Sequence, residues 1–125
     1  MNYFVDSSVW IEYFKGNTEY LFLNELINTN AICTNDIVLT ELLPAIIHKK
    51  EHELAELLGS IKKYELNIDW QDIRDIQQKN IQHGNSNTGI SDIIIVQNCI
   101  QNKLRLISRD KHFKAMTRYT KLALY

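Results

Sequence analysis

The sequence has little of what marks a secreted, membrane-spanning or low-complexity protein. It contains two cysteines, Cys33 and Cys99, far apart and in apolar surroundings, which predicts buried free thiols in a reducing cytoplasm and no disulfide framework. One proline and four glycines leave no Pro/Gly-rich linker. No apolar run approaches the roughly 18 residues that cross a bilayer, and the first residues lack the features of a signal peptide. We therefore expect one cytoplasmic domain over residues 1–125, without a membrane partner.

The chain also lacks a net positive charge, since its formal charge is −1, and this argues at first against a polyanionic partner. The charges are unevenly distributed, however. Nine of the fifteen acidic residues lie within residues 1–60, whereas residues 103–121 hold seven basic residues and a single acid, Asp110. On charge alone, a solvated basic tail is the better explanation of that segment. An acid among cations would also suit a site that binds phosphate.

Apolar runs and capping residues predict strands that alternate with helices. Strands are expected at residues 3–5, 31–33, 64–66, 104–107 and 122–124. Helices are expected after a Ser7 or Ser8 cap up to Gly16, at 19–28, at 36–48, around 54–61, at 69–82, and from a Ser91 cap to 102, with a polar loop at 83–89. This alternation predicts an α/β domain with a mainly parallel sheet.

Four acids occupy positions where a surface charge is not expected. Asp6 and Asp110 follow predicted strands, Asp92 begins an isoleucine-rich helix, and Glu41 falls on or beside the apolar stripe of its helix. Helix capping or the helix dipole explains each Asp singly. Because functional sites of parallel sheets lie at the carboxyl ends of the strands, all four can converge there.

Carboxylates packed together repel one another, and burial adds a desolvation cost. A bound divalent cation removes both penalties. Oxygen ligands from Asp and Glu favour Mg²⁺ or Mn²⁺ over zinc, and a Mg²⁺ site of this kind takes additional oxygens from phosphate. The pattern therefore predicts metal-dependent chemistry on a phosphodiester.

Four sequence blocks resemble PIN-domain proteins, and more narrowly the VapC-type toxins of bacterial toxin–antitoxin pairs. The blocks, in order along the chain, are Val5-Asp6-Ser7-Ser8-Val9, Leu39-Thr40-Glu41-Leu42, Gly89-Ile90-Ser91-Asp92-Ile93-Ile94-Ile95-Val96 and Leu106-Ile107-Ser108-Arg109-Asp110-Lys111-His112-Phe113. One block alone would be weak, because Asp-Ser-Ser is common. Together they cover essentially the whole chain, with the acids in family order and spacing.

The resemblance implies a three-layer α/β/α fold and an endoribonuclease that hydrolyses RNA with Mg²⁺ or Mn²⁺. It implies that the metal ligands and catalytic residues are Asp6, Glu41, Asp92 and Asp110. It further implies that Ser108 supports the acidic cluster, that Ser7 orients the first Asp, and that the chain forms a homodimer and binds a cognate antitoxin. Family members often carry a further acid where this chain has His112.

Nearby cations are candidates for contacts with substrate phosphates. Arg109, Lys111 and Lys114 are such candidates, although ordinary surface charge explains each of them as well. His83 and His112 have no obvious partner in the sequence. The aromatic stretches at residues 10–14 and 20–23 are either core, a dimer face or a groove for an antitoxin segment.

Two other functions fit parts of the pattern. A metal-dependent phosphatase on a doubly wound sheet would also place Asp6 at a strand end, but such enzymes usually carry a second Asp two residues on, where this chain has Ser8. A PIN-like module that only binds or regulates is the other alternative. The complete set of four acids argues against it.

Overall fold

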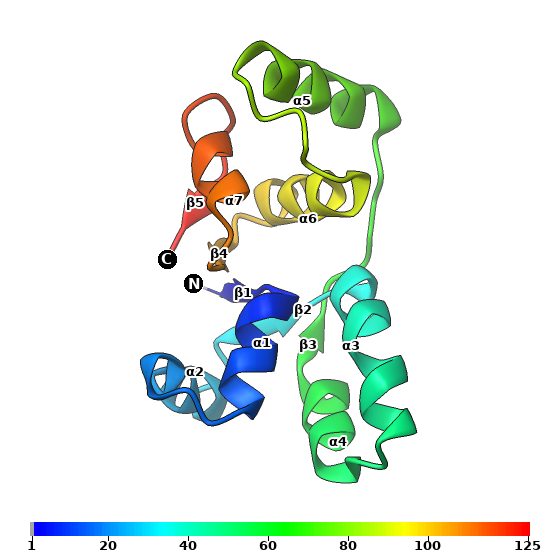
Figure 1. Cartoon of the computed structure of the whole chain (residues 1–125), viewed down its shortest axis with the longest axis vertical. Helices are drawn as coiled ribbons and strands as arrows, with labels where there is room; N and C mark the ends of the chain where they lie inside the picture. The colour runs from blue at the N-terminus through cyan, green and yellow to red at the C-terminus, as the bar shows by residue number, and fades with distance from the viewer. Residues whose placement is uncertain (1) are drawn as a thin grey trace.

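A five-stranded parallel sheet forms the centre of the protein, in a computed structural model that describes residues 2–125 (Figure 1). The strands are β1 (Tyr3–Val5), β2 (Ile32–Thr34), β3 (Lys62–Lys63), β4 (Arg105–Ile107) and β5 (Ala123–Leu124), in the spatial order β3-β2-β1-β4-β5. Phe4 of β1 is in register with Cys33 on one side and with Leu106 on the other. The mainly parallel sheet predicted from the sequence is confirmed.

Helices cover both faces of this sheet. They are α1 (Ser7–Phe14), η1 (Thr18–Tyr20), α2 (Leu23–Asn28), α3 (Asp36–His48), α4 (His52–Ser60), α5 (Trp70–Gln82), α6 (Ile90–Gln101) and α7 (Lys111–Met116). Neighbouring residues of a strand point to opposite faces, and Phe4 and Val5 both have 0 % exposure, so neither face is open to solvent. The helices α4 and α5 lie at opposite ends of the long axis, with the sheet between them (Figure 1).

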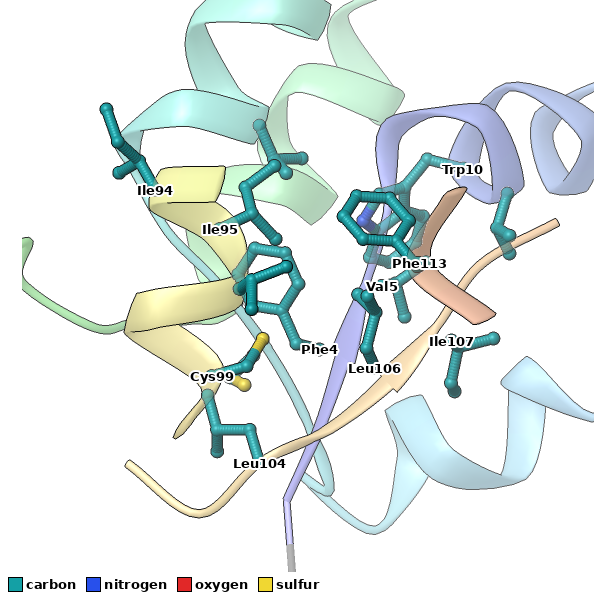
Figure 2. Close-up of a cluster of buried hydrophobic side chains, with 14 of the residues drawn as sticks. Phe4, Val5, Trp10, Ile94, Ile95, Cys99, Leu104, Leu106, Ile107 and Phe113 are labelled. Atoms are coloured by element: carbon teal, nitrogen blue, oxygen red, sulfur yellow. The ribbon is translucent and has the colours of Figure 1, made fainter. Parts of the chain in front are cut away.

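The core is one cluster of aliphatic and aromatic side chains on the two sides of β1 and β4. Figure 2 shows this cluster, to which α6 contributes Ile95 and Cys99 and α1 contributes Trp10. Cys33 and Cys99 are both free and buried, as the sequence predicts, and desolvation raises the pKa of the Cys33 thiol to about 12. Among residues 2–125, no helix is long and apolar enough to span a membrane.

Two predicted elements differ most from the structure in their bounds. The third strand is Lys62–Lys63 and not 64–66, because backbone pairing extends only from Cys33 and Thr34, after which the Tyr64 N–H donates a single bond to the Thr34 carbonyl at 2.9 Å. Two exposed lysines suit a short edge strand. The helix predicted at 19–28 begins as the turn η1 and becomes α-helical only at Leu23.

Two predicted helix caps are also wrong. Asp6, and neither serine, caps α1, because the helix begins at Ser7, whose N–H donates to Asp6 Oδ1 at 2.9 Å. Gly89, and not Ser91, stands at the cap of α6, which has no capping bond from a side chain. In both cases the helix starts earlier than the sequence suggests. Asp6 therefore sits at the junction of β1 and α1.

Candidate active site

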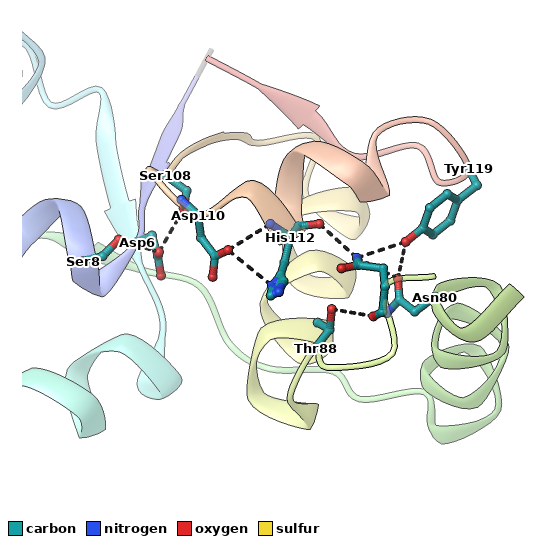
Figure 3. Close-up of polar contacts among 9 residues, drawn as sticks. Asp6, Ser8, Asn80, Thr88, Ser108, Asp110, His112 and Tyr119 are labelled. Carbon is teal, nitrogen blue, oxygen red and sulfur yellow. Dashed lines mark hydrogen bonds and ion pairs between the residues drawn. The ribbon is translucent and has the colours of Figure 1, made fainter. Parts of the chain in front are cut away.

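The carboxyl edge of the sheet gathers acids from separate elements. Asp6 leaves β1, and Asp110 follows β4, the neighbouring strand of the sheet. Asp92 lies in the first turn of α6, and Glu41 lies in the middle of α3. Pairing of β1 with β4 thus brings together residues that are about a hundred positions apart in the chain. Figure 3 shows Asp6, Ser108 and Asp110 side by side at this edge.

Asp6 is the most buried of the four acids, with 7 % exposure. Its Oδ2 accepts hydrogen bonds from the hydroxyls of Ser8 at 2.9 Å and Ser108 at 3.0 Å. Burial raises the pKa of the Asp6 carboxyl above its usual value, while these hydrogen bonds act in the opposite direction. The site therefore holds the Asp6 side chain in one orientation without supplying a compensating charge.

Ser108 connects Asp6 to Asp110. Its hydroxyl donates to Asp6 and accepts from the backbone N–H of Asp110 at 3.0 Å. Asp110 in turn caps α7, since its Oδ1 accepts the N–H of His112 at 2.8 Å. A single hydroxyl thus links the Asp6 carboxylate to the backbone of Asp110.

Glu41 is oriented by α1. The Ser7 hydroxyl donates to Glu41 Oε1 at 2.9 Å, so this serine orients the Glu, whereas Ser8 is the serine whose hydroxyl reaches Asp6. Glu41 lies beside the apolar stripe of α3, as the sequence predicts, and it is exposed because the helix turns Val38 and Leu42 into the core. An exposed carboxylate beside a buried one is accessible to a ligand from solution.

Asp92 lies within the electrostatic field of the other three acids. Its pKa is raised to about 6, first by burial and then by the charges of Asp6, Asp110 and Glu41. The positive charge that His112 carries when protonated acts in the opposite direction. The fields of the other three acids thus meet at Asp92, which places all four in one electrostatic cluster.

No lysine or arginine neutralises this cluster within residues 2–125. The only ion pair of the four acids there joins Asp110 Oδ1 to His112 Nδ1 at 3.5 Å. Arg109 turns away and pairs with Glu12 at 3.2 Å. Lys111 and Lys114 are exposed on α7.

The donor chemistry fits a hard divalent cation, since the cluster offers unneutralised carboxylate oxygens. In the part of the chain that the structure describes, no three His, Cys, Asp or Glu side chains stand close enough together to enclose an ion as they are. Asp6, Asp92, Asp110 and Glu41 are the residues that would hold it.

A groove adjoins the acidic edge. It is lined by α1, α3 and the start of α4, has a volume of about 420 Å³, and reaches Glu41. Its apolar lining comes from Ile11, Phe14, Leu42, Ala45, Ile46 and Leu54. Ile11 is 43 % exposed, so part of the first aromatic stretch faces this groove, while Trp10 is fully buried in the core.

Comparison with known proteins assigns the chain to a family. The sequence profile of the PIN domain matches residues 3–119. The chain belongs to the PIN domain family. No curated protein matches the chain in sequence.

Solved structures share this PIN-domain fold. The chain is similar to a protein in the crystal structure of VapBC2 from Rickettsia felis bound to a DNA fragment from their promoter, with a TM-score of 0.78 and 20 % identity over 100 % of this chain and 98 % of that one. It is also similar to PAE2754 from Pyrobaculum aerophilum, with a TM-score of 0.64 and 15 % identity over 99 % of this chain and 83 % of the other. The predicted three-layer α/β/α fold is confirmed.

Several residues of this PIN domain site were missed by sequence reasoning. Ser8 is one, since only a bond to Asp6 distinguishes it from Ser7. Both histidines thought to lack partners have one: His112 contacts Asp110, and His83 stacks on Tyr119 with ring centroids 4.2 Å apart. Asn85 is another, and its contact with the His112 carbonyl crosses 27 positions of the chain, which no local pattern reveals.

Proposed function

We propose that this chain is a divalent-metal-dependent endoribonuclease, a VapC-type toxin of a toxin–antitoxin pair, in one cytoplasmic domain spanning residues 1–125. The observation that carries the proposal is the cluster of four acids without a lysine or arginine partner in the described chain, at the carboxyl edge of a PIN-domain sheet. Metal ions remove the repulsion that such a cluster creates.

The four acids have distinct tasks in this proposal. Asp6, Asp92 and Asp110 hold Mg²⁺ or Mn²⁺, and Glu41 completes the set from the solvent side. Ser8 and Ser108 keep the Asp6 carboxylate aimed at the site, and Ser7 does the same for Glu41. When bound, the ion makes water nucleophilic at neutral pH and neutralises charge that develops on the phosphate.

Cations beside the cluster would bind the substrate. Lys111 begins α7 and Lys114 lies in its last turn, and both are exposed, so they could bind phosphates of an RNA strand that enters the acidic edge. Arg109 is available only if it leaves Glu12, to which it is paired. In-line attack of water on phosphorus would leave a 5′-phosphate and a 3′-hydroxyl, with no covalent intermediate on the protein.

The groove beside Glu41 supports the antitoxin part of the proposal. Its apolar lining suits the apolar face of an amphipathic segment, and its charged lining has both signs, from Lys15, Lys49, Glu41 and Glu51. A segment seated there would lie against Glu41 and block access to the acids. We also propose a homodimer, as the family resemblance implies.

Two other functions remain distinguishable from a nuclease. A PIN module that only binds would retain RNA affinity without cleaving it. A phosphatase would hydrolyse a small phosphate monoester, but the position two residues after Asp6 is Ser8, whose hydroxyl is bonded to Asp6 and leaves no second carboxylate there. The cluster of four acids favours the nuclease.

Mapping of cleaved ends tests the proposal. Total RNA is incubated with the protein and Mn²⁺, and new 5′-phosphate ends are sequenced. We expect discrete ends with the wild type and at least a hundredfold fewer with Asp92→Asn, while Asp75→Asn, on the exposed face of α5, cleaves normally. Equal cleavage by wild type and Asp92→Asn would refute the assignment.

Expression in a bacterial host tests the toxin role. The wild-type chain is expected to arrest growth, whereas Asp6→Ala is expected to leave growth unaffected at an equal protein level. Equal toxicity of the two chains would contradict a role that depends on the acidic site.

A further inference from the structure

A second groove lies away from the four acids. It consists of two adjoining hollows, of about 630 Å³ and about 440 Å³, which share Ile100 and Lys121 in their walls. The first hollow lies between α5, the end of α6 and the chain after α7, and the second lies between the end of α6 and the amino ends of β4 and β5. Figure 1 shows these elements in one half of the molecule, with α4 in the other half. We call the two hollows together the basic groove.

The walls of the basic groove carry almost only positive charge. Their charged residues are one acid, Asp72, and the cations Lys79, Lys103, Arg105, Arg118 and Lys121. The three lysines and Arg118 are exposed and take part in no ion pair within residues 2–125, whereas Arg105 donates to the Leu124 carbonyl at 3.3 Å. In a chain of formal charge −1, this concentration of cations favours an anionic partner.

Hydrogen bonds anchored on a buried amide fix one wall of the basic groove. Tyr119 lines the groove, and its hydroxyl donates to the amide oxygen of Asn80, which has 0 % exposure (Figure 3). The Asn85 side chain donates to the same hydroxyl at 3.1 Å. The chain that carries Arg118 is thereby tied to α5, which carries Lys79. Cations on a fixed framework lose less conformational freedom when a partner binds.

Exposed cations connect the basic groove to the acidic edge along α7. Lys111 and Lys114 lie three residues apart on this helix and therefore on one side of it. Arg118 follows in the next turn, where its backbone N–H donates to a carbonyl of α7 at 3.2 Å. On α6, Asp92 lies in the first turn and Ile100 near the end, and 100 − 92 = 8 residues at a rise of about 1.5 Å separate them by about 12 Å. A partner that reaches both sites must therefore be an extended chain.

We propose that the basic groove binds the backbone of single-stranded RNA next to the bond that is cut at the acids. The inference rests on the proposed nuclease for the identity of this polyanion. An RNA strand carries a phosphate on each nucleotide, so it can contact cations that are spread over such a distance, whereas a single phosphate cannot. Contacts to phosphates carry no sequence information, so the groove should strengthen binding to RNA of any sequence.

Fluorescence anisotropy with a labelled single-stranded RNA of about 16 nucleotides tests the groove. A chelator prevents cleavage, and Lys79→Gln/Lys121→Gln is compared with Lys50→Gln/Lys62→Gln, which loses the same charge before α4 and at the start of β3. We expect the Kd to rise at least tenfold in the groove variant and less than twofold in the control. The slope of log affinity against log salt concentration should become shallower by about 1.4 in the groove variant, or about 0.7 for each lost phosphate contact.

Circular dichroism verifies that both variants are folded. Equal Kd values of the two variants overturn the basic groove and leave the proposed nuclease intact. Tighter binding of duplex DNA of the same length, or of polyglutamate, that is lost in the groove variant overturns the choice of RNA as the partner. Absence of RNA binding to the wild type at low salt overturns both proposals together.

Cleavage gives a second readout that separates binding from chemistry. New 5′-phosphate ends in total RNA are counted over time with Mn²⁺ and with protein in excess. We expect the protein concentration that gives half the maximal rate to rise at least tenfold in Lys79→Gln/Lys121→Gln, with an unchanged maximal rate, because the groove does not touch the reacting phosphate. A lower maximal rate at an unchanged half-maximal concentration overturns the role of the groove. If the wild type binds RNA through the groove but cuts none, the proposed nuclease fails, and with it the identification of the bound strand as substrate.

Discussion

Asp92 carries much of the electrostatic cost of the site. Its pKa is raised to about 6, with burial as the largest cause, so the folded metal-free protein binds a proton at Asp92 between about pH 4 and pH 6 that the unfolded chain releases. The contribution of Asp92 therefore lowers the free energy of unfolding as the pH rises through that window. Above pH 6 the folded protein bears the full penalty of the charged form.

Asp92→Asn is accordingly expected to stabilise the metal-free protein at pH 7.5. The rise of the Asp92 pKa to about 6 corresponds to at most about 3 kcal/mol in the free energy of unfolding. Asp92 is partly solvated, so we expect the variant to gain about 1–2 kcal/mol. Urea unfolding in the presence of a chelator measures it, and the gain should vanish near pH 4. Glu56→Gln, an exposed change on α4, should have no such effect. A destabilised Asp92→Asn protein at pH 7.5 would contradict the electrostatic account.

Ser108 links the Asp6 carboxylate to the backbone of Asp110. Ser108→Ala removes the donor to Asp6 and the acceptor of the Asp110 N–H, both at 3.0 Å. We expect Mn²⁺ affinity to fall about 10- to 100-fold, as is usual when a hydrogen bond that orients a ligand is lost. Calorimetric titration measures this. Ser60→Ala, which removes only a bond to the Leu57 carbonyl, is the matched control, and equal affinities of the two variants would argue against this role.

At the scale of elements, the sequence predicts where strands lie but not which distant residues each element contacts. Apolar runs located the strands around Asp6 and Asp110, because a buried parallel strand is a continuous apolar segment that ends in a polar residue. The register of β3 and the exposure of Glu41 depend on which neighbour each element packs against. Arg109 likewise pairs with Glu12 across the fold, which no spacing predicts.

The link between α5, the loop after it and α7 is the element-scale feature that the sequence conceals. Asn80, Asn85 and Tyr119 are ordinary surface residue types, yet they form a network whose central amide is fully buried. Their spacing shows no period, because each comes from a different segment. The positions of the acids could therefore be predicted, whereas the framework that holds α7 could not.

Tyr119→Phe tests that framework. The change keeps the ring that stacks on His83 but removes the hydroxyl that donates to Asn80 and accepts from Asn85. Because Asn80 is fully buried, we expect the free energy of unfolding to fall by about 1–3 kcal/mol in urea titrations. Tyr13→Phe removes an exposed hydroxyl bond to Asn24 and should cost much less. Similar losses in the two variants would show that the network adds no specific stability.

At the scale of the whole molecule, the proposed metal site would couple ion binding to folding. Asp6 and Asp110 follow β1 and β4, while Glu41 and Asp92 lie in α3 and α6. The four acids approach one another only when the sheet has formed, so the unfolded chain offers no comparable site. Whatever binds the folded state alone raises its stability. Under the proposed function, the acids that lower the stability of the metal-free fold would be the ligands that stabilise the metal-bound fold.

Thermal unfolding with and without metal measures this coupling. At a free Mn²⁺ concentration about 100 times the dissociation constant, the stabilisation is about 2.7 kcal/mol, which corresponds to a rise in Tm of roughly 5–10 °C for a domain of this size. Asp6→Asn keeps the size of the side chain but removes the charge of the most buried of the four acids. We therefore expect Mn²⁺ not to raise the Tm of this variant. Asp75→Asn should show the full rise, and a chelator should reverse it. If Mn²⁺ stabilised Asp6→Asn as strongly as the wild type, the ion would be binding elsewhere, and the cluster at the sheet edge would need another explanation for its unneutralised charge.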